Sequence, residues 1–403
     1  MDSLPVELVQ SIFALLPPLS VLKFTRINKR IRSSIVSESF AALSLCHLTR
    51  SDLTTSLNLA ILFSVGVPAT FKTVYARLLA NNAVITLRGA ERLLLKNGSV
   101  LPSMIPQQIG LVTSLRSLDL TGGKASGPLP AELSLLKNLN TLNLKGNKHD
   151  SEVPDLSGLP YLTILNLSFN ELSGRLDSAK FPTSLVRLLL DGNQLEGTIS
   201  DMSAFKNLLH FSACGNRLTG NIPDSFCRGC PLLEVLLLKN NQLSGPLTPA
   251  MSRWTALQVL DLSLNHLTGG MRDVCQCLAL RTLDLSCNNF SGPLDPGLGN
   301  LRDLWTLNLA KNHFSGPVPA AVGNLRALVR LWIEDNDLTG RLPADFGNLH
   351  QLSFVSLSGN LLVTKLPEGI EYCPEGLITG LREQRSVRQE RTRQWLRHIF
   401  RSK

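Results

Sequence analysis

The chain has 403 residues, of which 43% are hydrophobic and 18% charged, and its formal net charge is +9. No segment reaches the roughly 18 consecutive apolar residues of a membrane-spanning helix, and Asp2 and Glu7 stand where a secretory signal would be basic. Residues 1–100 hold 11 Lys/Arg against 5 Asp/Glu, residues 101–380 hold 21 against 24, and residues 381–403 hold 8 against 2. The near-neutral central region argues against a nucleic-acid groove along it.

The first 45 residues predict a small domain of three short helices. Apolar residues recur at helical spacing between Pro5 and Leu16, where a pair of prolines ends the first helix. Ser20 can cap a second helix, and an isoleucine stripe marks a third, at Ile27, Ile31 and Ile35. Because so few residues build only a very small core, much of their apolar surface remains available to a partner.

This stretch resembles the F-box, through Leu4-Pro5-Val6-Glu7-Leu8 and the apolar and proline positions after it. Ile31 stands where the family often has Trp, and Ile27 where it often has Val. The resemblance implies binding to a Skp-type adaptor and, through it, to a cullin of a ubiquitin ligase. The residues that would make or support this contact are Leu4, Pro5, Leu8, Ile12, Leu15, Leu16, Leu19, Val21 and Leu22. The alternative is a helical cap that only shields the first repeat of the array described below.

Residues 46–92 carry no clear motif. Two apolar stretches, 58–65 and 71–79, are long enough for helices around Gly66 and Pro68. We expect a helical connector or N-terminal cap over 46–92.

Asparagine recurs at intervals of 23 to 25 residues through the rest of the chain. Most copies come after a Leu-x-Leu pattern and the others after a similar apolar-x-apolar pattern, which predicts a short strand with one buried face. Such a period indicates one unit repeated in a stack, in which neighbouring units complete each other's core. We expect each Asn to turn inward and bond free backbone groups of the adjoining turns. The row comprises Asn147, Asn170, Asn193, Asn216, Asn241, Asn265, Asn288, Asn312, Asn336 and Asn360.

The frame resembles the plant-type leucine-rich repeat, with copies such as Leu218-Thr219-Gly220-Asn221-Ile222-Pro223 after the Asn. Weaker copies begin at Leu118 and Leu93. The fold class is therefore expected to be α/β: a right-handed leucine-rich-repeat solenoid of about 11–12 repeats over residues 93–375, preceded by the all-α domain. Residues 376–403 form a basic tail.

Side chains between and beside the two leucines should line the inner face of the predicted arc and contact a target protein. Leu189 and Leu237 are apolar where water is expected, and Trp332 with Arg330 and Phe354 forms an aromatic–arginine group, a composition enriched at interface hot spots. The alternative is that the C-terminal segment covers this group. The full candidate set is Arg187, Leu189, Leu237, Lys239, Asp261, Asp284, Asn308, Arg330, Trp332, Glu334 and Phe354.

The chain shows no enzyme motif, and we expect no catalytic residue, metal or cofactor. Cys227-x-x-Cys230 and Cys275-x-Cys277 fall two repeats apart, about 10 Å along the stack, too far for one zinc site or for a disulfide between the pairs. We expect reduced, buried or idle thiols. Six of the seven histidines are interpreted as surface residues: His149, His210, His266, His313, His350 and His398.

The basic tail could lie on an anionic membrane surface, bind an acidic partner or act as a nuclear address; the alternative is a disordered charged tail. Taken together, the sequence predicts a cytoplasmic or nuclear, non-catalytic substrate-recognition subunit of a Skp–cullin–F-box ubiquitin ligase. One alternative is an intracellular repeat scaffold whose N-terminal helices are only a cap. A third hypothesis is an extracellular leucine-rich-repeat recognition protein.

Overall fold

The computed structural model describes residues 92–94, 104–105 and 107–363. They fall in two compact units: unit 1 runs to Gly174 and includes 179–193, and unit 2 comprises 175–178 and the described residues from Gln194 onward. The F-box-like helices expected at 1–45, nearly all of the connector and the basic tail lie outside the described residues.

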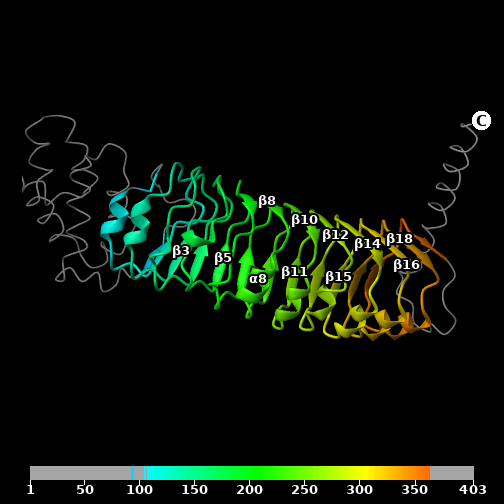
Figure 1. Ribbon diagram of the computed structural model, residues 1–403. Coiled ribbons are helices and arrows are strands. Elements are labelled where there is room, and N and C mark those ends of the chain that lie inside the picture. Colours follow the sequence, from blue (N-terminus) through cyan, green and yellow to red (C-terminus); the bar gives the residue numbers. More distant parts are fainter. Residues whose placement is uncertain (1–91, 95–103, 106, 364–403) are drawn as a thin grey trace, which may run out of the picture. The chain divides into compact units, whose positions relative to one another are not determined.

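Each repeat forms a three-residue strand of the first sheet, centred on the first apolar residue of its Leu-x-Leu frame (Figure 1). The middle residue of the strand is buried in every case for which burial is described, and the flanking residues are exposed or half-buried, apart from Ser212. In unit 1 the parallel strands are β1 (Arg92–Leu94), β2 (Ser117–Asp119), β3 (Thr141–Asn143), β4 (Ile164–Asn166) and β5 (Arg187–Leu189). The weak copy around Leu93 is thus confirmed as a strand, in register with β2.

In unit 2 the same sheet type continues with strictly parallel neighbours. Leu236, Leu260, Leu283, Leu307 and Leu331 lie opposite one another in successive strands, so each repeat buries its leucine against the next. The strands are β7 (His210–Ser212), β9 (Val235–Leu237), β11 (Val259–Asp261), β13 (Thr282–Asp284), β15 (Thr306–Asn308), β17 (Arg330–Trp332) and β19 (Phe354–Ser356).

A second parallel sheet, which the sequence did not predict, forms in unit 2 from the x-Leu-x-Gly segments after each Asn. Its apolar residue points into the core, as Leu243, Phe290 and Phe314 do. Its strands are β6 (Glu196–Thr198), β8 (Arg217–Gly220), β10 (Gln242–Pro246), β12 (His266–Gly269), β14 (Asn289–Pro293), β16 (His313–Pro317), β18 (Asp337–Gly340) and β20 (Leu361–Leu362).

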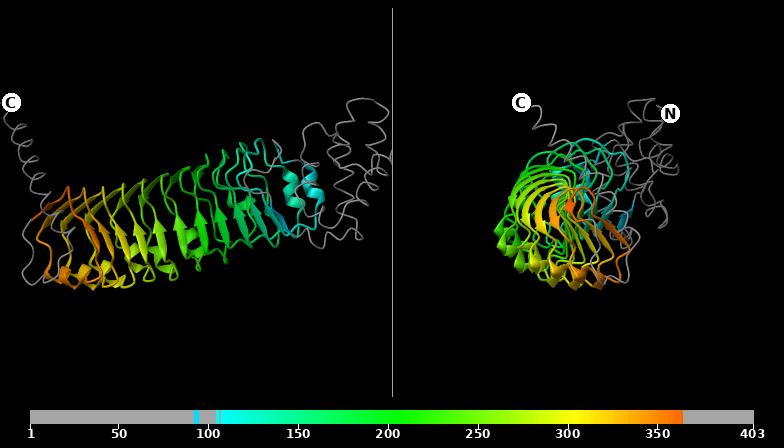
Figure 2. Two further views of the ribbon diagram at one scale, coloured as in Figure 1. Left: turned by 180° about the vertical axis from the view of Figure 1, so that it is seen from behind. Right: turned by 90° about the vertical axis from the view of Figure 1, so that its right-hand side faces the viewer.

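Short helical turns close the third side of each stack and in unit 2 lie side by side along one edge (Figure 2). Close packing is possible because a Cβ on Gly323 would lie only 2.3 Å from the Asp345 carbonyl oxygen. The turns are η2 (Gln107–Leu111), η3 (Ala131–Leu135), η4 (Ser178–Lys180, divided between the units), α8 (Asp224–Gly229), η5 (Pro249–Arg253), η6 (Val274–Gln276), η7 (Pro296–Asn300), η8 (Ala320–Asn324) and η9 (Ala344–Asn348).

The core between these walls is mostly leucine, and each fully buried leucine contributes about 1.5–3 kcal/mol. Aromatic residues also fill part of the core of unit 2, where Phe226 makes edge-to-face contacts with Phe211 at 5.7 Å and with Trp254 at 5.4 Å. Because every repeat shares its core with its neighbours, the outward surface is held in a fixed register from repeat to repeat.

The asparagine row is confirmed as a structural ladder. The Asn288 amide donates to the carbonyl oxygens of Leu262 at 2.9 Å and Leu285 at 3.2 Å, and its own oxygen accepts the Leu267 N–H at 2.9 Å. The other ladder residues repeat this pattern, as Asn312 does with Leu285, Leu309 and Phe290. The row therefore holds turns together and is not available for chemistry.

One histidine prediction is wrong. His149 is fully buried, because it occupies the position after the ladder Asn where Leu172 and Leu195 stand in the next two copies. His266, His313 and His350 are exposed, as expected, and His210 is half-buried. The burial of His149 lowers the pKa of its imidazole, although Nδ1 lies 3.0 Å from the Gly127 carbonyl oxygen.

The cysteine pairs of unit 2 are buried, free thiols. Burial raises their pKa to about 12, and three of them donate to backbone carbonyl oxygens, including Cys277 to Met251. They are Cys227, Cys230, Cys275 and Cys277. Thiols of this kind are inert and serve as core side chains.

Candidate functional site

The candidate surface is the strand face of unit 2, which we define as the outward-facing side chains of its first-sheet strands and of the residues two positions after each strand. The repeat geometry creates it, because the leucines on either side of each outward residue point into the core. Most of the residues predicted to contact a target lie here: Leu237, Lys239, Asp261, Asp284, Asn308, Arg330, Trp332, Glu334 and Phe354.

The structure brings Arg330, Trp332 and Phe354 together at the C-terminal repeats. The Trp332 and Phe354 ring centroids lie 5.0 Å apart, and the Arg330 guanidinium carbon lies 5.9 Å from the Trp332 ring centroid. Arg330 Nη2 also donates to Thr306 Oγ1 at 3.2 Å. Phe354 remains 42% exposed, so the cluster offers an apolar patch next to a positioned positive charge.

Glu334 lies next to this cluster in the sequence and is half-buried, with Oε2 shielded from solvent and lacking a hydrogen-bond partner within the described chain. Its carbonyl oxygen accepts the Lys311 N–H at 2.9 Å. A shielded, unpaired carboxylate oxygen is unfavourable, so a donor from a partner would stabilise it.

Two acidic side chains occupy the middle of the strand face. Asp284 accepts hydrogen bonds from the Asn308 amide at 2.9 Å and from the Ser286 hydroxyl at 2.6 Å. Asp261 is held in the same way by Ser263, at 2.6 Å. Burial raises the pKa of Asp261, against the lowering effect of the Ser263 hydrogen bonds. Local bonds therefore fix the orientation of these carboxylates.

The remaining candidates are dispersed. Leu237 is half-buried on β9, in register with Asp261, and Lys239 is exposed two residues further on. Arg187 is exposed and Leu189 half-buried on β5, which belongs to unit 1. The adaptor-contact residues between Leu4 and Leu22 lie outside the described residues.

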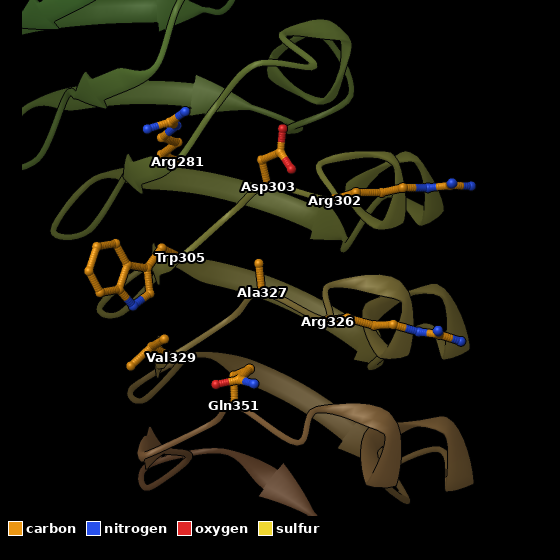
Figure 3. Close-up of a pocket in the computed structure, with 8 residues that line it drawn as sticks. All are labelled: Arg281, Arg302, Asp303, Trp305, Arg326, Ala327, Val329 and Gln351. Atoms are coloured by element: carbon orange, nitrogen blue, oxygen red, sulfur yellow. The ribbon is translucent and has the colours of Figure 1, made fainter.

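Sequence reasoning missed a surface hollow of about 770 Å³ at the edge where the helical turns lead into β13, β15, β17 and β19 (Figure 3). Arg281, Trp305, Arg302 and Arg326 line it, and Trp305 is 56% exposed. Strict alternation of buried and exposed side chains back from Leu307 would bury Trp305. The alternation does not reach Trp305, because β15 begins only at Thr306. The signal that could have found the hollow was Trp305 one repeat after Arg281, beside a second pair of arginines one repeat apart, Arg302 and Arg326.

Other site types lack support within the described part of the chain. It contains no group of three or more His, Cys, Asp or Glu side chains placed to hold a metal ion. None of the helices described there combines the length and apolarity needed to cross a membrane.

Family comparisons assign both parts of the chain. The F-box domain profile matches residues 1–42, a leucine-rich repeat region profile matches 239–368, and a single leucine-rich repeat matches 207–228. No curated protein sequence matches significantly.

Solved structures share the repeat fold. The crystal structure of a TDR receptor is 28% identical with a TM-score of 0.59, over 69% of this chain and 53% of the receptor chain. The Arabidopsis receptor kinase HAESA, in complex with the peptide hormone IDA and the co-receptor SERK1, is 28% identical to this chain with a TM-score of 0.53. The match covers 69% of this chain and 55% of the HAESA chain. The chain thus spans about half the length of these two receptor chains.

A leucine-rich-repeat protein of Leptospira interrogans is 24% identical with a TM-score of 0.58, over 84% of this chain and 90% of its own. It supports the fold alone. With an F-box domain at residues 1–42 and repeats that form a parallel-strand solenoid, this chain is an F-box/leucine-rich-repeat protein, a protein-interaction module.

Proposed function

We propose that this protein is the substrate-recognition subunit of a Skp–cullin–F-box type ubiquitin ligase. The F-box match at residues 1–42, ahead of the repeats, is the observation that carries the proposal. In this role the F-box binds a Skp-type adaptor, and through it a cullin, while the repeats hold a target protein.

The protein itself is non-catalytic in this proposal. Holding a target near a transfer enzyme raises the effective concentration of the target's lysines, which requires two binding surfaces and no reacting group. It needs no cofactor, and it acts in the cytoplasm or nucleus, where ubiquitin ligases find their targets. We propose no nucleic-acid partner; contact with a membrane surface would involve only the basic tail.

The strand face of unit 2 supports the target-binding half of the proposal. The Arg330–Trp332–Phe354 cluster combines an exposed aromatic side chain with a guanidinium held by Thr306, and Trp and Arg are enriched where a few residues carry most of the binding energy. In HAESA, repeats of similar geometry belong to a complex with a peptide and a second protein.

Co-purification tests the adaptor half. The tagged full chain, purified from its own cells, is expected to bring down a Skp-type adaptor and a cullin. A Pro5→Ala/Leu8→Ala/Leu22→Ala variant should lose both. A matched control replaces three polar residues of the same stretch (Gln10→Ala/Ser11→Ala/Lys23→Ala) and should retain them. Absence of the adaptor from the wild-type sample would refute the ligase role and favour the scaffold alternative.

Target capture is tested separately with Trp332→Ala. Because this position is far in sequence from the F-box, the variant should keep the adaptor and lose proteins that the wild type enriches. Ser356→Ala, on the neighbouring strand opposite Trp332, serves as the control and should keep them. If both variants enrich the same proteins as the wild type, the cluster is not the contact. A glycosidase-induced mobility shift of the same sample would favour the extracellular alternative.

A further inference from the structure

The hollow beside the strand face is a direct consequence of the repeat. Positions one period apart form three columns along unit 2, and Figure 3 shows Arg302 and Arg326 extending together, away from Trp305. A third column, between the Arg302–Arg326 column and the Trp305 column, holds Asp303, Ala327 and Gln351 (Figure 3). Ala327 has the smallest side chain of that column, so the surface sinks there.

The side chains that line the hollow carry a net positive charge. Arg281, Arg302 and Arg326 are exposed, and none of their guanidinium groups makes a hydrogen bond or ion pair within the described chain. Asp303 is the single carboxylate that lines the hollow with them. Three positive groups facing one negative group favour an anionic ligand.

The hollow lies next to the strands that carry the aromatic–arginine cluster. The Trp305 carbonyl oxygen accepts the N–H groups of Val329 at 2.9 Å and Arg330 at 3.1 Å, so Trp305 adjoins the strand that carries Arg330 and Trp332. Together they offer exposed aromatic surface flanked by guanidinium groups. The cations hold negative groups in place while the indole rings cover an apolar side chain.

A peptide fits this surface better than a nucleic acid. Unit 2 is nearly neutral over residues 194–363, with 12 Lys/Arg and 13 Asp/Glu, whereas a nucleic acid requires a basic stripe along its phosphates. Successive repeats lie about 4.8 Å apart and an extended chain rises about 3.3 Å per residue. The hollow spans the four repeats of β13, β15, β17 and β19, and the three spacings between them match an extended segment of about four or five residues.

We propose that this hollow, with the adjoining Arg330–Trp332–Phe354 cluster, binds an acidic linear segment of the target protein. Aspartate or glutamate carboxylates of the segment pair with Arg281, Arg302 and Arg326, and one apolar side chain rests over Ala327 against Trp305. The inference rests on the proposed function and names the chemistry that a target must present.

A direct binding assay tests it with the purified full chain. The probe is a fluorescein-labelled ten-residue peptide with two glutamates on each side of one leucine, in a glycine–serine background, and the readout is fluorescence anisotropy. We expect the probe to bind and a peptide with glutamine in place of glutamate to bind at least about tenfold more weakly, with the difference shrinking at high salt.

The arginine pair has a matched control. Arg302→Ala/Arg326→Ala should weaken binding about tenfold, since two charge pairs are lost. Arg253→Ala/Arg272→Ala removes the same charge from exposed positions of earlier repeats and should leave binding unchanged. Equal losses in the two variants would mean that only net charge matters and would overturn the site.

Two further variants change residues in the middle column of the hollow, Asp303 and Ala327. Asp303→Asn removes the opposing carboxylate and should tighten binding about two- to fivefold, a gain that misfolding cannot imitate. Ala327→Glu fills the hollow and adds a negative charge, so it should abolish binding, while Ala327→Ser should be tolerated. Unchanged affinity in both Asp303→Asn and Ala327→Glu would overturn the placement of the peptide.

Competition distinguishes other ligands. Displacement of the probe by an equal concentration of a ten-nucleotide oligouridine would overturn the peptide assignment. Binding of a phosphoserine peptide without any binding of the glutamate peptide would overturn the carboxylate chemistry. Adaptor co-purification from the same preparation separates the two proposals: a retained adaptor with no peptide binding refutes this inference alone, and peptide binding without an adaptor refutes the ligase role alone.

Discussion

Replacing the ladder residue Asn288 with alanine gives the sharpest test of how the repeats are held together. The change removes one acceptor and an amide whose two N–H groups contact three carbonyl oxygens, those of Leu262, Leu285 and Ser286, but the losses are unequal. The Ser286 carbonyl oxygen still accepts the Leu264 N–H at 3.0 Å. The carbonyl oxygen of Leu262 still accepts from Asn265 at 3.0 Å, and that of Leu285 still accepts from Asn312 at 3.0 Å. Only the buried Leu267 N–H, bonded to Asn288 at 2.9 Å, loses its acceptor.

These unequal losses set the expected magnitude. A buried N–H without a partner costs about 1–3 kcal/mol, and two shared bonds at the low end of the usual range add about 0.5 kcal/mol each. Asn288→Ala should therefore lower the free energy of unfolding by about 2–4 kcal/mol. The adjacent Asn289 is exposed on β14, so Asn289→Ala should stay within about 0.5 kcal/mol of the wild type.

Urea unfolding of the full chain, monitored by circular dichroism, measures both variants. Asn288→Asp refines the test, because it keeps an acceptor for Leu267 but turns a charged oxygen toward two carbonyl oxygens. It should cost more than Asn288→Ala at neutral pH and less as the pH is lowered, since a protonated carboxyl can donate. Equal stability of Asn288→Ala and Asn289→Ala would refute the ladder argument.

Three further predictions concern other buried or strained groups. Burial lowers the pKa of His149, so the stability that its neutral imidazole contributes is complete above the unfolded pKa near 6.5 and is lost as the pH falls toward the folded pKa. His149→Leu should therefore reduce the change of the urea unfolding midpoint between pH 7 and pH 5. Leu264 is exposed at a φ of 56°, so Leu264→Gly should stabilise the protein by about 0.5–1 kcal/mol, whereas Leu278→Gly, at an exposed residue without positive φ, should not; a higher thermal midpoint for the second variant only would contradict this. Burial raises the pKa of the thiols of Cys227, Cys230, Cys275 and Cys277 to about 12. Iodoacetamide at pH 8, with labelling measured for each cysteine-containing peptide, should therefore modify the half-exposed Cys287 before these four. Early labelling of the four buried cysteines would contradict their burial.

Much of the fold could be predicted from the sequence because it is encoded in local periodicity. A Leu-x-Leu pattern with Asn three residues later specifies a strand, its buried face and the turn after it, and the structure confirms this from Leu118 to Leu357. The burial of His149 could have been predicted in the same way, since it stands at a leucine position of the frame. The second sheet was missed because its strands contain a glycine, which locally indicates a turn.

For the candidate surface, too, some features follow from the sequence alone and others only from the tertiary structure. The sequence alone determined that Arg330, Trp332 and Phe354 face outward on neighbouring repeats, because alternation about a buried leucine fixes direction. Only the tertiary structure decided that Arg330 lies over the Trp332 ring and that Asp284 is tied to Asn308. It also decided that Trp305, Arg302 and Arg326 border one hollow. These contacts join residues that are about 24 positions apart in the sequence. Packing against the neighbouring repeat sets the path of the backbone at each turn, and this path determines which residues each side chain contacts.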